Sequence, residues 1–172
     1  MKFFRSILYI PVIILFFAGC SGYHLSGYGS ALPSYIRSIA IPVFKNSSSE
    51  PNIQKDATDA IRRAFISDGR LQVVNTRRAE LLMRGTLTDY QLRAVSFNSE
   101  DSAEEYIVRL GIHVEAYDRV KKKIMFEQKF TTQWDYRSSS IVADSESSRY
   151  TALKGAYEDL AERLVSITIE QF

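Results

Sequence analysis

The chain has 172 residues, of which 45% are hydrophobic and 24% are charged, enough for one domain with a hydrophobic core. Its 22 basic and 20 acidic residues leave a formal net charge of +2, which argues against a nucleic-acid-binding protein, because such proteins need a basic surplus. The single cysteine excludes an intramolecular disulfide.

The first residues have the three-part pattern of a bacterial export signal. Lys2 and Arg5 precede an apolar run over residues 7–18. The run is shorter than the roughly 20 apolar residues of a membrane-spanning helix, and Pro11 interrupts it, so we expect residues 1–19 to be cleaved off. Their removal takes away two basic residues, which leaves 20 basic (22 − 2) against 20 acidic residues and a formal charge of zero.

The end of the apolar run, Phe17-Ala18-Gly19-Cys20, resembles the lipobox of bacterial lipoproteins, with Phe17 where leucine is usual. We therefore predict that Cys20 is the lipid attachment site; an ordinary secretory signal and a buried free thiol are the alternatives. Several acyl chains on one cysteine would hold the protein at the membrane. Ser21, in place of an acidic retention signal, favours the outer membrane of a Gram-negative bacterium.

Residues 20–34 are rich in glycine and serine and predict a lipidated tether, which leaves 35–172 as the globular domain. Alternating hydrophobicity over 36–44 predicts a half-buried strand. Pro42 predicts that this is an edge strand or that the proline lies at the end of the strand. A helix should follow from an N-cap at Ser49 to about residue 67, with Gly69 ending it.

A short strand is expected at 71–74, and three longer ones follow. The first begins near Ala79, and its apolar residues change parity after Asp89, which predicts a bulge. After a polar loop over 97–105, residues 106–116 alternate regularly. A turn at 118–123 then leads into a return strand, so these segments should form an antiparallel hairpin.

The chain closes with a serine-rich, acidic loop over 137–148 and a helix with apolar residues three and four apart, from Tyr150 to Ile167. This order predicts an α+β fold: two helices packed on one face of a mostly antiparallel sheet of about four to five strands. The other face should be polar and turned towards water or a hydrophilic partner.

No pattern in the sequence indicates catalysis. The two histidines, His24 and His113, have no cysteine or carboxylate at metal-ligand spacing, so we expect no metal site and no cofactor. No nucleophile elbow or phosphate-binding glycine loop is present. We therefore predict a protein that is not an enzyme. The lysines at 121–123 are interpreted as a solubilising turn, with contact to anionic lipid as the alternative.

Several segments together resemble the LptE family of lipopolysaccharide-assembly lipoproteins. They are the start Cys20-Ser21-Gly22-Tyr23-His24-Leu25, Leu32-Pro33 before Ile39-Ala40-Ile41-Pro42-Val43-Phe44, the helix at 51–69, the strand Ala79-Glu80-Leu81-Leu82-Met83-Arg84-Gly85 and the closing helix. The resemblance covers essentially the whole mature chain. Its specificity comes from the ordered combination, since each segment alone is a weak signal.

The resemblance implies an outer-membrane lipoprotein that plugs the LptD β-barrel and helps to insert lipopolysaccharide into the outer leaflet. The implied partners are the barrel, lipopolysaccharide and membrane lipid. Candidate contacts to lipopolysaccharide phosphates are the cations Arg93, Arg109, Lys121, Lys122 and Lys123. A lipid-anchored scaffold of a different cell-envelope complex is the alternative.

Overall fold

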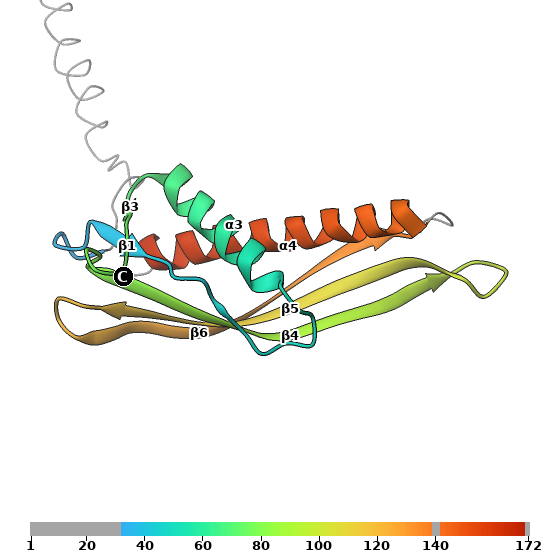
Figure 1. The fold of residues 1–172 in the computed structure, drawn as a ribbon, viewed down its shortest axis with the longest axis horizontal. Coiled ribbons are helices and arrows are strands. Elements are labelled where there is room, and N and C mark those ends of the chain that lie inside the picture. Colours follow the sequence, from blue (N-terminus) through green and yellow to red (C-terminus); the bar gives the residue numbers. More distant parts are fainter. Residues whose placement is uncertain (1–31, 139–141, 171–172) are drawn as a thin grey trace, which may run out of the picture.

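The computed structural model describes residues 32–138 and 142–170. The elements run in the order β1 (Ser38–Ala40), β2 (Lys45–Asn46), α3 (Ile53–Asp68), β3 (Gln72–Val73), β4 (Leu81–Phe97), β5 (Ala103–Asp118), β6 (Lys123–Arg137) and α4 (Val142–Glu170). Both helices lie on the same face of one six-stranded sheet (Figure 1). The prediction of an α+β fold with two helices on one sheet face is confirmed.

The sheet is mixed, with more strands than the four to five expected. The strand order is β3-β1-β4-β5-β6, with β2 also paired to β4. The long strands β4, β5 and β6 pair antiparallel, whereas β1 pairs parallel to β3 and β4, and β2 pairs parallel to β4. Helix α3 carries the chain back between β1 and its parallel neighbours, as parallel pairing requires a crossover.

The strand predicted over 36–44 is instead split around Pro42. Ile39 of β1 pairs with Leu81, and the chain rejoins β4 only at β2, where Lys45 pairs with Thr86. Proline has no N–H to donate, so the ladder cannot run through position 42. The gap places the Phe44 ring against Gly85, where an added Cβ would lie 2.4 Å from it.

Strand β4 contains the predicted bulge. Its pairing with β5 shifts register between Leu87 and Asp89. The side chains of Leu87 and Tyr90 consequently face the helices, although they are three positions apart. Gly111 lies opposite Asp89, and an added Cβ there would come within 2.9 Å of the Asp89 Cβ, so the bulge requires a residue without a side chain on β5.

The core lies between the sheet and the two helices. Strand β5 is paired along both edges, and one parity of its residues is at most 2% exposed: Val108, Leu110, Ile112, Val114 and Ala116. Fully buried side chains of the helices belong to the same hydrophobic core, namely Ile61 and Phe65 of α3 and Leu160, Leu164 and Ile169 of α4. The predicted inward parity of β5 is confirmed.

The helix starts differ from the predictions. Helix α3 begins at Ile53 after Asn52, which has a positive φ of 67° and makes no side-chain cap. Ser49, predicted as the N-cap, instead donates to the backbone oxygen of Tyr90 at 3.2 Å. Gly69 does end the helix, with a φ of 75° and its N–H on the carbonyl of Phe65.

Helix α4 also begins earlier than predicted, because residues 142–148 are helical rather than a loop. This first part carries serines and acids instead of an apolar stripe, so hydrophobic periodicity could not reveal it. Polar contacts hold it, including the Ser138 and Ser145 hydroxyls 3.0 Å apart.

The inward parity of β5 can be tested by burying a charge. We expect Ile112→Asp to lower the free energy of unfolding by about 3 kcal/mol or more, since a carboxylate would be placed in the core without a partner. Gln133→Asp, on the exposed face of the neighbouring strand β6, should cost less than about 0.5 kcal/mol. Urea denaturation followed by circular dichroism measures both. Equal stability of the two variants would mean that the faces of the sheet are reversed.

Candidate functional site

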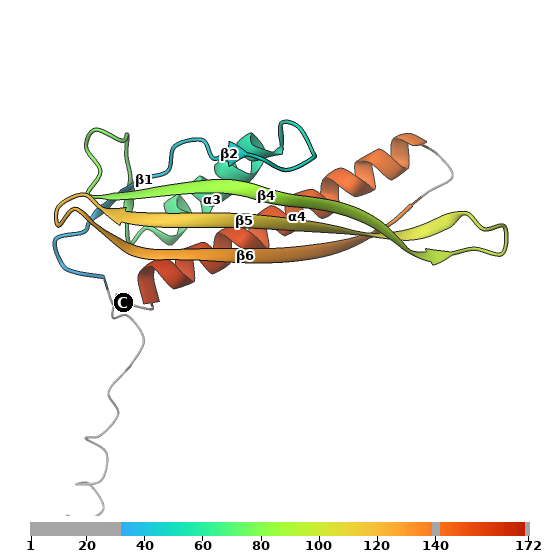
Figure 2. The same ribbon diagram turned by 90° about the horizontal axis from the view of Figure 1, so that it is seen from below.

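The sheet face turned away from the helices is uncovered by other described elements and largely polar (Figures 1 and 2). We call it the open face. The strand register places these residues on it: Arg84, Thr86, Gln91 and Arg93 of β4, Arg109, His113 and Glu115 of β5, and Glu127, Lys129, Thr131 and Gln133 of β6. The prediction of a polar second face agrees with this arrangement.

On the half of the open face nearer the β5–β6 turn, opposite charges pair with one another. Arg84 forms an ion pair with Glu115, directly opposite on β5, and its guanidinium lies 5.8 Å from the centre of the Tyr117 ring. His113 Nε2 lies 2.9 Å from Glu127 Oε1. Exposed pairs of this kind contribute little to stability. These pairs give the half of the open face nearer the β5–β6 turn a surface of mixed sign.

Two of the predicted lipopolysaccharide contacts, Arg93 and Arg109, lie together on the open face. Arg109 is opposite Gln91, so Arg93 is its diagonal neighbour, about 7 Å away between backbone positions. Both side chains are exposed, and no described residue forms an ion pair with either. The structure therefore joins two of the five predicted cations into one exposed pair.

The other three lie at the turn between β5 and β6: Lys121 and Lys122 in the turn and Lys123 as the first residue of β6. Asp118, the last residue of β5, is nine positions from Arg109, which is about 30 Å of strand. The five predicted cations thus form two separate groups rather than one site.

The β5–β6 turn is organised by Asp118, whose side chain is fully buried. Its carboxylate accepts the Tyr35 hydroxyl at 2.6 Å and the backbone N–H groups of Val120 and Lys121 at 2.8 and 2.9 Å. Burial acts to raise the pKa of Asp118, but these three hydrogen bonds outweigh it and leave the pKa below its ordinary value. The same bond, with burial, raises the pKa of Tyr35 to about 12.

Glu80 makes a second carboxylate contact beside this turn. It accepts the backbone N–H groups of Arg37 and Ser38 at 2.6 and 2.9 Å, and the Ser38 hydroxyl at 3.1 Å. The Arg37 bond is the main reason that the pKa of Glu80 is lowered, against the opposing effect of burial. Through Asp118 and Glu80, the first described residues are held against β4 and the β5–β6 turn.

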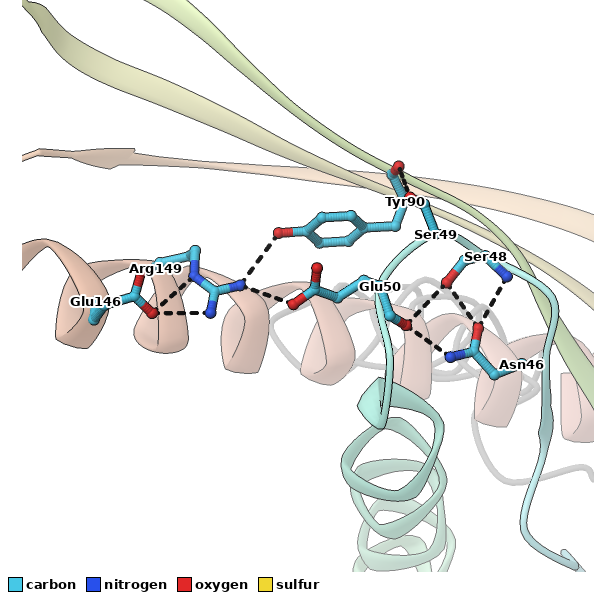
Figure 3. Close-up of polar contacts among 7 residues, drawn as sticks. All are labelled: Asn46, Ser48, Ser49, Glu50, Tyr90, Glu146 and Arg149. Carbon is cyan, nitrogen blue, oxygen red and sulfur yellow. Dashed lines mark hydrogen bonds and ion pairs between the residues drawn. The ribbon is translucent and has the colours of Figure 1, made fainter.

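A third polar contact lies towards the other end, where Arg149 joins three elements (Figure 3). Its guanidinium lies 3.1 Å from Glu50, 2.9 Å from Glu146 and 3.4 Å from the Tyr90 hydroxyl. Asn46 supports Glu50 by donating its amide to the Glu50 carbonyl at 2.7 Å. The bonds to Glu146 and Tyr90 raise the pKa of Arg149. This cation is thus already paired and fixes the start of α4 to the sheet.

Beside Arg149, tyrosines line a cavity of about 440 Å³ between β4, β5, β6 and the start of α4. Tyr106 and Tyr136 stack there with ring centres 5.4 Å apart, and Tyr90 and Leu92 complete the apolar part. Burial raises the pKa of Tyr136, so its hydroxyl stays protonated. The sequence predicted an inward Tyr106 but missed this cavity, because its wall depends on the early start of α4.

Among residues 32–138 and 142–170, no group of three or more histidine, cysteine, aspartate or glutamate side chains could hold a metal ion. None of the described helices is long and apolar enough to cross a membrane. Cys20 and the boundaries of the predicted signal and tether lie outside the described residues.

Comparison with known proteins supplies a family match. The model of the LptE family, described as lipopolysaccharide-assembly, matches residues 36–166. None of the curated proteins matches the sequence.

Solved structures share the fold at low sequence identity. A minor lipoprotein from Acinetobacter baumannii is 17% identical, with a TM-score of 0.53 over 79% of this chain and 92% of that one. Rare lipoprotein B from Shewanella oneidensis is 16% identical, with a TM-score of 0.51 over 72% and 90%. An uncharacterized lipoprotein B from Nitrosomonas europaea is 15% identical, with a TM-score of 0.52 over 86% and 92%. At these identities the likeness is one of fold alone.

The buried carboxylate of Asp118 should make stability depend on pH. Because its folded-state pKa is lowered, its contribution is complete above the unfolded pKa of about 4 and is lost as pH falls through the folded pKa. We expect Asp118→Asn to lower the free energy of unfolding by about 1–3 kcal/mol at neutral pH. This difference from wild type should shrink towards pH 3 in urea denaturation.

Asp135→Asn is the matched control, since that carboxylate is exposed on β6. Its stability should follow wild type across the pH range. An Asp118→Asn deficit that stays constant down to pH 3 would show that the carboxylate charge is not what stabilises the turn.

Proposed function

Because this chain belongs to the LptE family of lipopolysaccharide-assembly proteins, we propose that it is a non-catalytic outer-membrane lipoprotein that plugs and supports the LptD β-barrel. In this proposal it acts in the transport of lipopolysaccharide and its insertion into the outer leaflet. The observation that carries the proposal is the family match over residues 36–166, which takes in nearly all the strands and helices described above.

The open face supports a plug. The interior of a large outer-membrane barrel is polar and hydrated, so a protein seated in it needs a hydrophilic surface. The open face offers such a surface, with ion pairs such as Arg84–Glu115 already satisfied within the chain. Charges that are already paired within the chain can lie against a polar wall without being buried unpaired.

Arg93 and Arg109 are the cations best placed for lipopolysaccharide. Guanidinium groups bind phosphate through paired N–H donors, and these two side chains are exposed, adjacent and without an ion pair to any described residue. The β4–β5 turn beyond this pair is acidic, with Glu100 and Asp101, so we expect phosphates to bind at the arginine pair and not at the turn. The lysines at 121–123 lie too far away to act with the arginine pair on one phosphate cluster.

Membrane attachment completes the proposal. Residues 1–19 act as the signal, Cys20 carries the acyl chains, and residues 20–34 tether the domain on the periplasmic side and in the barrel lumen. Catalytic residues, a metal and a cofactor have no part in this function.

The barrel partnership is tested by affinity purification of the tagged protein from detergent-solubilised outer membranes of its own host. We expect a large β-barrel protein in roughly equal amount after a stringent wash, identified by mass spectrometry. Ile112→Asp, whose fold should be strongly destabilised, is the control that separates specific from non-specific recovery. Recovery of another envelope complex without a barrel would favour the lipid-anchored scaffold instead.

The arginine pair is tested separately with purified protein and lipopolysaccharide. We expect Arg93→Gln with Arg109→Gln to weaken lipopolysaccharide binding by about tenfold or more, since two charged contacts to phosphate are lost. The control Lys55→Gln with Lys154→Gln removes the same charge from the two helices and should bind as wild type does. Equal weakening in both double variants would show that overall charge, rather than this pair, determines binding.

A further inference from the structure

The two ends of the molecule carry opposite charge, although the mature chain is formally neutral. The β5–β6 turn and the β4–β5 turn lie at opposite ends of the long axis (Figures 1 and 2). Exposed cations gather at the first of these, which we call the anchor end: Arg37, Arg77, Arg78, Lys121, Lys122 and Lys123. The far end carries the acids Glu100, Asp101, Glu104 and Glu105, which outnumber the exposed Arg137 opposite Glu105.

The turns of the anchor end are joined to one another. Arg119, which follows β5, donates its side chain to the carbonyls of Thr76 and Ala79, and its backbone N–H to the carbonyl of Glu80 at 2.8 Å. This brings Arg77 and Arg78 alongside the three lysines. The cations therefore belong to one surface, although more than 40 positions separate Arg77 from Lys121 in the sequence.

The carboxylates of the anchor end bind groups within the chain. Asp118 and Glu80 each accept hydrogen bonds from backbone N–H groups. Asp68 and Glu170 form ion pairs with Arg70, at 2.6 and 3.6 Å. Lys121 lies with its Nζ 4.9 Å from the centre of the Tyr35 ring. None of the described carboxylates forms an ion pair with Lys121, Lys122 or Lys123. Asp118 and Glu80 stay ionised and offset part of this charge, Asp118 by attraction to Lys121 and Glu80 by attraction to Arg37. The six exposed cations outnumber these two carboxylates, so the surface keeps a positive surplus.

Apolar side chains accompany the lysines at the tip. Val120 is 56% exposed, and Ile124 is 48% exposed on the other side of the triplet. Cations beside short apolar side chains suit the headgroup region of a membrane, where ammonium groups meet phosphates and methyl groups enter the acyl boundary. The hydrogen bonds of Asp118 hold this tip in one conformation, which reduces the entropic cost of binding.

The start of the described chain lies at the same end. Tyr35 bonds to Asp118 within the turn, and Leu32 is three positions earlier. Leu32 is twelve positions from Cys20, so the anchor end can be at most about 40 Å from acyl chains on that cysteine. A surface held this close to a membrane meets it at high effective concentration.

We propose that the anchor end docks on anionic phospholipid headgroups of the leaflet that holds the acyl chains, through Lys121, Lys122 and Lys123 with Val120 at the interface. The acidic β4–β5 turn then points away from that leaflet, so docking sets the direction of the long axis. The inference rests on the lipid attachment of the proposed function.

The test uses the full lipidated protein reconstituted into vesicles. Cys20 is the single cysteine of the chain and is blocked by acylation, so Val120→Cys provides one thiol for an environment-sensitive fluorophore. Vesicles of phosphatidylcholine with about 30% phosphatidylglycerol are compared with phosphatidylcholine alone. A second protein carries the label at Ser99→Cys in the β4–β5 turn.

We expect the label at position 120 to shift to the blue and brighten with phosphatidylglycerol only, and to revert in about 0.5 M salt, where charges are screened within a few ångströms. Replacing the three lysines by glutamine should reduce the equilibrium constant between docked and undocked protein about fivefold for each lysine removed. The matched variant Lys45→Gln, Lys55→Gln, Lys129→Gln, labelled at position 120, should keep the wild-type response. The label at position 99 should show no dependence on phosphatidylglycerol.

Flotation of the vesicles distinguishes a failure of the lipid attachment from a failure of the docking. Wild type should float with them and Cys20→Ala should not; a wild type that does not float refutes the lipid attachment and the docking with it. Flotation without a phosphatidylglycerol-dependent change at position 120, or an equal loss in both lysine variants, overturns the docking and leaves the barrel plug intact.

Discussion

Burial of one side of β5 is the constraint on which the rest of the structure depends. Strand β5 pairs along its whole length with β4 and β6, and its residues from Val108 to Ala116 are excluded from water on one side. Two helices are needed to cover that side, which leaves the other free. The apolar face thus supplies stability, while the polar face remains available for a partner.

Two irregularities adapt this sheet to its helices. The bulge before Asp89 reverses the parity of β4, so that Tyr90 turns inward where α4 begins and meets Arg149. The break at Pro42 lets the Phe44 ring pack over Gly85. Each costs ladder hydrogen bonds, and each brings a loop or a helix end into contact with the sheet.

Buried carboxylates fix the end of the domain where the described chain starts. Asp118 and Glu80 use their oxygens on backbone N–H groups, and the six exposed cations of the anchor end form no ion pair with a described carboxylate. Residues 35–172 hold as many basic as acidic residues, yet the uneven placement of these charges gives the domain a positive end and a negative end. Such an arrangement can orient a tethered protein against a charged surface without adding net charge.

The sequence by itself determined the parity of β5, the bulge near Asp89, the end of α3 at Gly69 and the family resemblance, because each follows from local patterns of side chains. Only the tertiary structure decided what depends on contacts between distant segments. The split around Pro42, the early start of α4 and the partners of Arg149 are of this kind. The division of the five predicted cations into an arginine pair and a lysine turn also needed the fold. The register between β4 and β5 decides that Arg93 lies beside Arg109, and hydrophobic patterns do not give that register.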